Sequence, residues 1–551
     1  MILRSIVNAQ GKSHFFPSKK FLGHVPRFFE YSNLDSSIDT FRSVHQSRYI
    51  CHTIGRLRGG IEYLDTPVNS TLEYTTNDYN RVYIAIGANV GDRFQNLMSA
   101  ISKLNDTDPK DSTSKRSIVV TKTSFLRETS PMYVTDQPSF LNGAIEIETI
   151  LSPHALLRRL KQIESDIGRD FYNGIRYGPR PIDLDIIFYG NGRDDADGIV
   201  LESSSLQIPH PRMHERNFVL APLCDINQNI FHPLLNMSTK EILSKINQSQ
   251  NDHSSDYIEP SGVKVLPLPR NRMLALNKIH IMGILNVTPD SFSDGGIFEG
   301  SIDLAVQRAL QLVEDGASIV DIGGESTRPG AKEVELEAEL NRTIPVIRRI
   351  RQISDDIIIS IDTRNSAVAK AAVEAGADIV NDVSGGTYDP KMFHIVSQLR
   401  VPIVIMHSRG TPETMQTMTQ YEDVVTEVSA SLSKQSALAE AAGIPRWLQI
   451  LDPGIGFAKD LNGNLSLLKH MDKIRSLVDD IPLLIGPSRK GFIGKLSNEP
   501  IANERDFGTL SSCLVSILRS DNTVVPTILR VHNVKGIKQG LTVFEAVLNA
   551  K

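Results

Sequence analysis

The sequence predicts an α+β domain followed by a (β/α)8 barrel. Two observations support this. Between residues 279 and 531, eight short apolar runs alternate with helical patterns, which is typical of a (β/α)8 barrel. Between residues 81 and 189, strand-like runs are interleaved with two amphipathic helical patterns, which predicts a smaller ferredoxin-like sheet with helices. The chain has 551 residues, which is long enough for both units.

The barrel prediction starts from the positions of its apolar runs. The predicted strands are residues 279–283, 319–321, 357–362, 379–382, 401–406, 448–452, 483–486 and 528–531. The helical patterns between them include residues 303–316, 334–353, 366–376, 421–443 and 505–518. Because the carboxyl ends of barrel strands share one face, side chains that follow these runs should meet there.

Nearly every predicted barrel strand ends in a polar cluster. The residues are Asn286, Asp321, Asp362, Asn381, Asp382, His407, Asp452, Ser488 and His532. Loops of any barrel are polar, so one such residue would mean little. Acids and amides on so many strand ends predict a polar ligand at this face.

The first domain is predicted from shorter patterns. Strand-like runs cover residues 81–87, 119–124, 141–147 and 182–189, and helical patterns cover 94–104 and 154–168. From residue 236 the chain becomes polar, which predicts a short helix and then a linker. We therefore expect domains at residues 80–235 and 273–551, joined by a linker at 236–272.

The N-terminal segment has the composition of an organellar targeting sequence. Residues 1–29 contain five Lys or Arg residues and no Asp or Glu, without a long apolar core. We expect residues 1–75 to be a targeting or disordered segment, with the mitochondrial matrix as destination. A plastid or a cytosolic location with an untargeted tail are the alternatives.

Composition excludes several other classes of protein. Lys+Arg 59 against Asp+Glu 64 gives a net charge of −5. The chain therefore lacks the excess of basic residues that would predict nucleic-acid binding. No apolar run reaches about 18 residues, which argues against a membrane-spanning helix. Three cysteines lie far apart, which excludes a disulfide framework. We expect small-molecule substrates, with neither nucleic acid nor membrane as partner.

The barrel residues indicate an anion site beside a heterocycle site. Lys490 follows the seventh strand, and Arg530 and His532 point to the same side of the eighth. Asn286 suits a phosphate-bound Mg²⁺. Three acids and amides could accept from or donate to a nitrogen-rich ring. These are Asp362, Asn381 and Asp452.

Six strings of the predicted barrel resemble dihydropteroate synthase, and the resemblance covers the whole barrel. They are MGILNVTPDSFSDGG (282–296), DIGGESTRPG (321–330), NDVSGG (381–386), DPGIGF (452–457), SRKGF (488–492) and RVHNV (530–534). The resemblance implies that 4-aminobenzoate displaces pyrophosphate from a dihydropterin pyrophosphate. The residues that it implies are Asp362, Asn381, Asp452 and Lys490 for the pterin, Asn286, Arg530 and His532 for pyrophosphate with Mg²⁺ at Asn286, and Thr327, Arg328, Pro329, Phe457 and Ser488 for aminobenzoate.

In the first domain, Asp183 and Asp185 lie at i and i+2 of a predicted strand and so share a face. Paired carboxylates suit Mg²⁺ carrying ATP phosphates, although a lone Asp-x-Asp is more often a solvated strand edge. Basic side chains nearby favour a polyphosphate. No P-loop is present, so side chains would have to hold the nucleotide.

This domain resembles 6-hydroxymethyl-7,8-dihydropterin pyrophosphokinase. The strings are IGAN (86–89), DQPSFLN (136–142), YGPRPIDLDII (177–187) and IPHPR (208–212). The resemblance implies transfer of pyrophosphate from ATP to the pterin hydroxymethyl group. The implied residues are Asp183 and Asp185 for two Mg²⁺ ions, Glu164, Arg169, Arg180, His210 and Arg216 for ATP, and Thr129, Ser130, Met132, Phe140, Asn142, Tyr177 and Phe218 for the pterin.

Three departures from these families are visible. Tyr177 stands where Trp is usual, the loop at 170–174 lacks an Arg, and residues 518–526 form a longer approach to the last strand. The product of the first reaction is nevertheless the substrate of the second. We therefore expect a bifunctional folate-synthesis enzyme that forms a homodimer or higher homo-oligomer. The alternatives are a pterin-binding barrel with an inactive or regulatory kinase half, or a pterin-methyl transferase.

Overall fold

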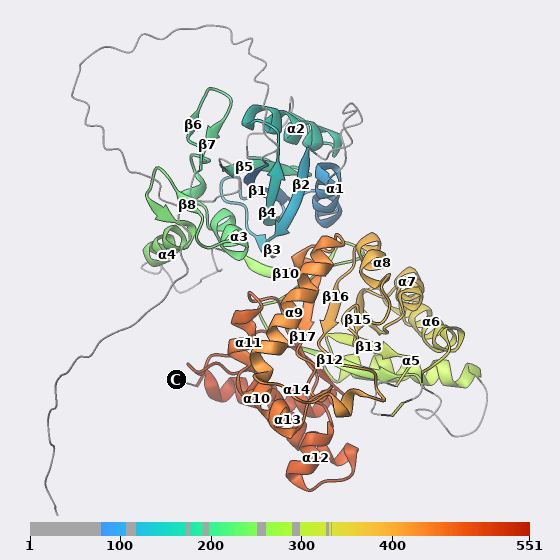
Figure 1. Cartoon of the computed structure of the whole chain (residues 1–551). Helices are drawn as coiled ribbons and strands as arrows, with labels where there is room; N and C mark the ends of the chain where they lie inside the picture. The colour runs from blue at the N-terminus through green and yellow to red at the C-terminus, as the bar shows by residue number, and fades with distance from the viewer. Residues whose placement is uncertain are drawn as a thin grey trace, which may run out of the picture. The chain divides into compact units, whose positions relative to one another are not determined.

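The computed structural model describes residues 79–105, 117–171, 177–190, 198–250, 261–288, 298–326, 330–331 and 333–550 (Figure 1). The predicted targeting segment therefore lies outside the described residues. Within the described part of the chain, no helix is both long and apolar enough to cross a membrane. The first domain and the barrel belong to one compact unit, Thr75–Lys551.

The first domain is built on the predicted sheet with helices, and its strands pair in antiparallel fashion. Its elements are β1 (Asn80–Ala88), α1 (Arg93–Asn105), β2 (Ile118–Thr123), β3 (Leu126–Thr129), β4 (Phe140–Thr149), α2 (Pro153–Asp166) and β5 (Asp183–Tyr189). The strands follow the order β3-β4-β1-β5, and β2 also pairs with β4. Strand β1 at the centre is held on both sides by antiparallel ladders.

Successive side chains of β1 point to opposite faces of the sheet, and each face packs against a different layer of the domain. Val82 and Ile84 are fully buried and pack in the same cluster as Leu97 of α1 and Leu160 of α2. Tyr83 points to the opposite face, as the period of two residues requires. There it packs in a second cluster with side chains of helices α3 (Asn217–Ile226) and α4 (Thr239–Gln250). The sheet is therefore covered by helices on both faces.

Short elements complete this domain. They are β6 (Leu201–Glu202), β7 (Gln207–Ile208), β8 (Phe231–His232) and β9 (Met237–Ser238), in two separate hairpins. They surround α3 in the chain and precede α4.

The segment predicted as a linker contains a strand that joins the two domains. After α4, strand β10 (Val263–Leu268) pairs with β3 through Val263–Val265 and with β11 (Arg272–Ala275) through Val265–Leu268. Leu266 and Leu268 of the same strand pack in one cluster with residues of the barrel strands. Strand β10 thus lies between β11 and β3 in the first sheet and also packs against the barrel strands, where the sequence predicted a linker.

All eight predicted barrel strands are present. They are β12 (His280–Asn286), β13 (Ile319–Gly323), β14 (Ile358–Asp362), β15 (Ile379–Asp382), β16 (Ile403–Met406), β17 (Gln449–Asp452), β18 (Leu484–Ile485) and β19 (Ile528–Val531). Their order is β17-β16-β15-β14-β13-β12-β19-β18, with parallel pairing throughout. A parallel bridge between Leu451 and Leu483 closes the ring.

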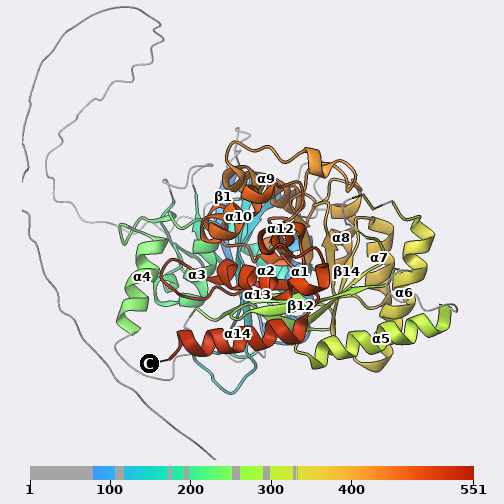
Figure 2. The same cartoon turned by 90° about the horizontal axis from the view of Figure 1, so that it is seen from below.

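Helices surround this parallel sheet (Figure 2). They are α5 (Phe298–Glu314), α6 (Leu336–Ile353), α7 (Ser366–Ala375), α8 (Met392–Leu399), α9 (Val424–Ala441), α10 (Leu461–Lys469), α11 (Met471–Leu477), α12 (Gly491–Ser497), α13 (Asp506–Ile517) and α14 (Val534–Leu548). The longer approach to the last strand, residues 518–526, forms a small hairpin closed by a bridge between Leu518 and Val524.

Candidate active sites

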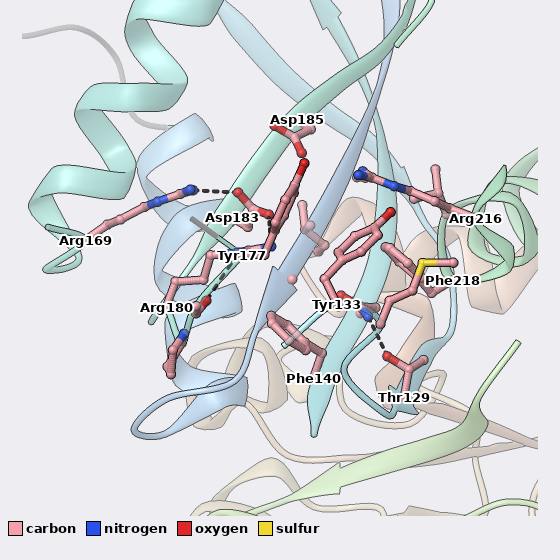
Figure 3. A pocket seen from close by; sticks show the side chains of 18 of the residues that line it. Thr129, Tyr133, Phe140, Arg169, Tyr177, Arg180, Asp183, Asp185, Arg216 and Phe218 are labelled. Carbon is pink, nitrogen blue, oxygen red and sulfur yellow. Dashed lines mark hydrogen bonds and ion pairs between the residues drawn. The ribbon is translucent and has the colours of Figure 1, made fainter. Parts of the chain in front are cut away.

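A cavity of about 670 Å³ opens at the carboxyl end of β3 and beside β5 in the first domain (Figure 3). Its size falls within the range of small-molecule sites. Every residue that the pyrophosphokinase resemblance implies for pterin binding lines this cavity. These are Thr129, Ser130, Met132, Phe140, Asn142, Tyr177 and Phe218.

Asp183 and Asp185 project from one face of β5 into this cavity, as their spacing predicts. Arg169 Nη1 lies 2.5 Å from Asp183 Oδ1, and Arg180 Nη2 lies 2.8 Å from Asp183 Oδ2. Figure 3 shows Arg169 and Arg216 on opposite sides of the carboxylate pair. The pair therefore has a cationic surround, which a polyphosphate requires.

The two carboxyl groups differ in their electrostatic environment. Burial acts to raise the pKa of Asp183, but Arg180 and Arg169 outweigh it and the pKa is lowered. Burial and the neighbouring Asp183 raise the pKa of Asp185 to about 6. The nearest cation to Asp185 is Lys161, whose Nζ is 3.9 Å from Oδ1. Asp185 is the carboxylate with more remaining capacity for a further cation.

Glu164 occupies a different place from the other predicted ATP residues. It is fully buried and does not line the cavity. Its Oε1 accepts from the backbone N–H of Leu184 at 2.6 Å and from Arg169 Nη1 at 2.7 Å. The geometry makes Glu164 a support for Arg169 and for strand β5. Arg169, Arg180, His210 and Arg216 all line the cavity.

His210 is a neutral donor at the cavity wall. Burial and then Arg216 lower its pKa to about 4. Its Nδ1 accepts from the backbone N–H of Arg212 at 3.2 Å. The proton of the neutral ring therefore resides on Nε2, which is left to donate to an anion.

Sequence reasoning missed an aromatic neighbour of Tyr177. The Tyr133 ring lies 4.5 Å from the Tyr177 ring, and the Arg212 guanidinium lies 5.0 Å from the Tyr133 centroid. Gln137 donates from Nε2 to the Tyr177 carbonyl at 2.9 Å. Gln137 belongs to the string 136–142 that carried the resemblance, so its position, although not its role, was visible in the sequence.

In the barrel, the strand register brings the predicted polar residues together. Asn286 lies opposite Gly323, Gly323 opposite Asp362, and Asp362 opposite Asn381. Glycine at position 323 therefore separates two polar side chains at the same level of the barrel. Asp452 is the last residue of β17 and therefore lies at the same carboxyl end of the barrel.

Arg530 connects residues that were predicted to hold different parts of a ligand. Its Nη2 donates to Asp362 Oδ2 and its Nε donates to Asp321 Oδ2, each at 2.6 Å. Asp321 also accepts from Asn381 Nδ2 at 3.1 Å. Burial, outweighing Arg530, raises the pKa of Asp362 to about 7. Asp321 was predicted only as a strand-end acid. The structure shows that it accepts hydrogen bonds from both Arg530 and Asn381.

Lys490 reaches across the loop after β17. Its Nζ lies 3.9 Å from the Phe457 ring centroid, and its stem passes Gly456, where a Cβ would come within 2.7 Å of Lys490 Cδ. Gly456 has a φ of +82°, so both its conformation and this close approach require glycine. Burial and then Arg530 lower the pKa of Lys490 to about 8.

The remaining barrel residues divide into two groups. Ser488 Oγ lies 2.9 Å from His532 Nδ1 and accepts from the His532 backbone N–H at 3.1 Å. Thr327, Arg328 and Pro329 lie outside the described residues.

Among the residues described in either domain, no group of three or more His, Cys, Asp or Glu side chains is placed to hold a metal ion.

Two family models match the chain. The model of 7,8-dihydro-6-hydroxymethylpterin-pyrophosphokinase matches residues 83–228, and the pterin binding enzyme model matches residues 282–532. The folate synthesis bifunctional protein, mitochondrial, of Arabidopsis thaliana is 41% identical over 508 residues, covering 89% of this chain and 87% of that protein. The chain belongs to the bifunctional folate synthesis proteins.

Other relatives agree for each half of this folate synthesis protein. The dihydropteroate synthase of Synechocystis is 45% identical over 300 residues, covering 54% of this chain and 99% of that protein. The HPPK-DHPS of Plasmodium falciparum shares the fold at a TM-score of 0.65 and 24% identity, covering 86% of this chain and 96% of that one. The chain is thus both a hydroxymethyldihydropterin pyrophosphokinase and a dihydropteroate synthase, and the predictions of fold and function are confirmed.

Proposed function

We propose that the cavity of the first domain binds the dihydropterin and ATP side by side for the pyrophosphokinase step. The observation that carries this assignment is that all seven predicted pterin residues and the Asp183–Asp185 pair line one cavity. The pterin ring lies against Phe140, Tyr177 and Phe218, since aromatic faces favour stacking. Its hydroxymethyl oxygen attacks the β-phosphorus of ATP, and AMP leaves.

In this proposal, the cations of the cavity stabilise the charge that develops on the transferred phosphoryl group. Arg169 and Arg180 neutralise Asp183 in the described structure and exchange this partner for phosphate oxygens when ATP binds. Arg216 approaches from the opposite wall, and His210 donates from Nε2. Glu164 acts indirectly by orienting Arg169.

The residues present also fit Mg²⁺. This ion is commonly held by one or two carboxylates together with substrate phosphates and waters, so Asp183 and Asp185 suffice without a third protein ligand. When bound, Mg²⁺ neutralises phosphate charge at the reacting centre. In the barrel, Asn286 supplies one oxygen ligand of the same kind.

For the synthase step, we infer that the constellation around Arg530 divides between the two parts of the pterin diphosphate. Asp362, Asn381, Asp452 and Lys490 hold the ring, and Arg530, His532 and Asn286 hold the diphosphate. Breaking the C–O bond leaves positive charge on the pterin methylene and negative charge on the leaving group. Asp362 stabilises the first and Arg530 the second. The neutral amine of 4-aminobenzoate then attacks, directed by Thr327, Arg328, Pro329, Phe457 and Ser488.

A paired assay on the full chain tests these assignments. Asp183→Asn should abolish pyrophosphate transfer from ATP while the synthase, supplied with ready-made pterin diphosphate, keeps its rate. Lys490→Met should raise the KM for pterin diphosphate and leave the pyrophosphokinase unchanged. Loss of both activities in either variant, or normal kinetics in both, would contradict the assignment of separate sites.

We also propose that the enzyme forms a homodimer through helices α13 and α14. The two helices pack closely, since a Cβ on Gly540 would come within 2.6 Å of Leu510. Several of their apolar side chains are nevertheless exposed: Phe507 at 86%, Val543 at 65% and Val547 at 67%. Such side chains favour a partner of matching apolar character. Phe507→Glu should convert a dimer into monomers in light scattering, and a wild-type monomer would contradict the proposal.

For location, we propose the mitochondrial matrix. The acid-free basic segment at residues 1–29 supports import, and a plastid or the cytosol remain the alternatives. A fluorescent fusion to the C-terminus should overlap a mitochondrial marker and become diffuse when residues 2–75 are deleted. Plastid or diffuse signal from the full chain would contradict this location.

A further inference from the structure

A buried ion pair links the ends of two neighbouring barrel strands. Arg364 follows β14 and Glu325 follows β13. The guanidinium donates from Nε to Glu325 Oε2 at 3.0 Å and from Nη2 to Glu325 Oε1 at 2.8 Å. The two side chains are 12% and 9% exposed. This bidentate geometry fixes the position of both groups more strictly than a single contact would.

The same carboxylate also holds the far side of the loop after β13. Glu325 Oε1 accepts from the backbone N–H of Val334 at 3.2 Å. Glu325 and Val334 therefore lie on either side of residues 327–329 in the chain and are in direct contact. Gly330 N donates to the Pro412 carbonyl at 3.1 Å, which adds an anchor on the loop after β16.

Arg364 reaches the loop by a second route. Its guanidinium lies 4.1 Å from the centroid of the Tyr388 ring, on the segment after β15. The Tyr388 hydroxyl donates to Glu333, which precedes Val334. One guanidinium thus acts on the residues before and after 327–329, through Glu325 on one side and through Tyr388 and Glu333 on the other.

We propose that Arg364 is a positioning residue of the synthase, which fixes Glu325 directly and Glu333 through Tyr388, and thereby affects the use of 4-aminobenzoate. The inference rests on the proposed role of residues 327–329 in aminobenzoate binding. Arginine is required because lysine offers neither the planar fork for Glu325 nor a flat face for Tyr388. Because the contacts of Arg364 within the described residues are to Glu325 and Tyr388, we expect its effect to fall on the second substrate.

The test uses the full chain and measures both activities. For Arg364→Met, we expect the KM for 4-aminobenzoate to rise about tenfold or more, with the KM for pterin diphosphate and the pyrophosphokinase rate within about twofold of wild type. The KM of Arg364→Lys for 4-aminobenzoate should lie between those of wild type and Arg364→Met. Tyr388→Phe keeps the ring but loses the hydroxyl, and its KM should rise less than that of Arg364→Met. Arg349→Met, at an exposed position of α6, is the matched control.

A double-mutant cycle identifies the partner. Glu325→Gln should raise the same KM, and combining it with Arg364→Met should add little, because both remove one interaction. Additive effects, unchanged kinetics, or an equal rise of both KM values with a lower melting temperature would overturn the proposal.

Arg328→Ala separates this inference from the proposed function. If Arg328→Ala raises the aminobenzoate KM and Arg364→Met does not, the loop binds the substrate but Arg364 does not position it. If neither variant changes this KM, the assignment of the loop itself is wrong and the inference fails with it.

Discussion

Arg530 and Asp362 form an ion pair at the carboxyl end of the synthase barrel, with Nη2 2.6 Å from Oδ2. The pair unites a residue proposed to hold the departing diphosphate with one proposed to stabilise the pterin cation. Arg530 is held on its other edge by Asp321, which is fully buried. The guanidinium is therefore oriented before any substrate arrives, and preorganised charge of this kind lowers a barrier most effectively.

Replacing Arg530 by lysine tests this preorganisation. A lysine keeps the charge but cannot contact Asp321 and Asp362 through a planar fork. We expect synthase kcat/KM to fall by about 100-fold to 1000-fold, which corresponds to the roughly 2.7–4 kcal/mol lost with one preorganised donor. The pyrophosphokinase of the same chain should keep its rate. Arg519→Lys, at an exposed position, is the control, and a loss below about threefold for Arg530→Lys would contradict the role.

The positions of the barrel strands could be predicted because each is a short apolar run that ends at a polar residue. Asp362 and Asp452 end their strands as predicted, and the parallel register then brings Asp362 beside Asn381. What the sequence did not reveal was the role of Asp321. Its importance depends on Arg530, a distant residue whose long side chain can reach several strands.

Strand β10 shows a different limit of sequence reasoning. The run at 263–268 is apolar enough for a strand, but periodicity does not tell which sheet edge it joins. Only the structure shows that β10 pairs with β3 on one side and β11 on the other. The predicted linker therefore overlaps an element that both enzymes share, and cutting the chain at residue 260 would remove β10 and β11 from the sheet of the pyrophosphokinase.

Gly262, directly before β10, provides a test of this shared strand. It has a φ of +75°, and a Cβ there would lie 2.4 Å from Thr129 Cγ2 and 2.5 Å from the Glu128 carbonyl oxygen. Gly262→Ala should therefore displace β3 and raise the pyrophosphokinase KM for the pterin severalfold, because Thr129 lines that cavity. Overpacking of this kind destabilises by about 1–3 kcal/mol.

Gly91→Ala is the matched control for Gly262→Ala. Gly91 has a similar φ of +71°, but the nearest atom to its Cβ would be Asn96 Nδ2 at 3.8 Å. Both variants share the cost of a left-handed alanine, and only Gly262→Ala adds the clash. Equal losses of melting temperature and pterin affinity in the two variants would show that β10 does not support the cavity.

Glu339 gives a prediction for the pH dependence of stability. It is 3% exposed on α6, and burial raises the pKa of its carboxyl group to about 7. The folded state therefore binds the proton more tightly than the unfolded state, in which the pKa is about 4.5. The stabilisation is fully present below pH 4.5 and is lost as the pH rises towards 7, at up to about 1.4 kcal/mol per pH unit.

Glu339→Gln should remove this dependence, since glutamine resembles the neutral acid in shape. Urea unfolding between pH 5 and 8 should give a flatter stability curve for Glu339→Gln than for wild type, with the variant gaining most above pH 7. Glu337→Gln, exposed on the same helix, should follow the wild-type curve. Parallel curves for wild type and Glu339→Gln would show that this carboxyl group does not titrate in the stated range.

The buried side chain of Lys459 hydrogen-bonds to the loop after β17, and we expect its removal to affect the synthase but not the pyrophosphokinase. The side chain is 4% exposed, and its Nζ lies 3.1 Å from His407 Nδ1 and donates to the carbonyl oxygens of Gly454 and Phe457 at 2.9 Å each. Lys459→Met removes this donor from all three acceptors. The Gly454 carbonyl still accepts from the Phe457 backbone N–H at 3.1 Å. Each buried acceptor that is left unsatisfied costs about 1–3 kcal/mol.

Because this loop begins after Asp452, which we assign to the pterin ring, Lys459→Met should raise the KM for pterin diphosphate, lower the melting temperature and leave the pyrophosphokinase rate unchanged. Lys469→Met, exposed at the end of α10, removes a similar charge without these contacts and should change none of the three. A lower melting temperature with normal synthase KM values would mean that the ammonium group stabilises the barrel but does not shape the pterin site.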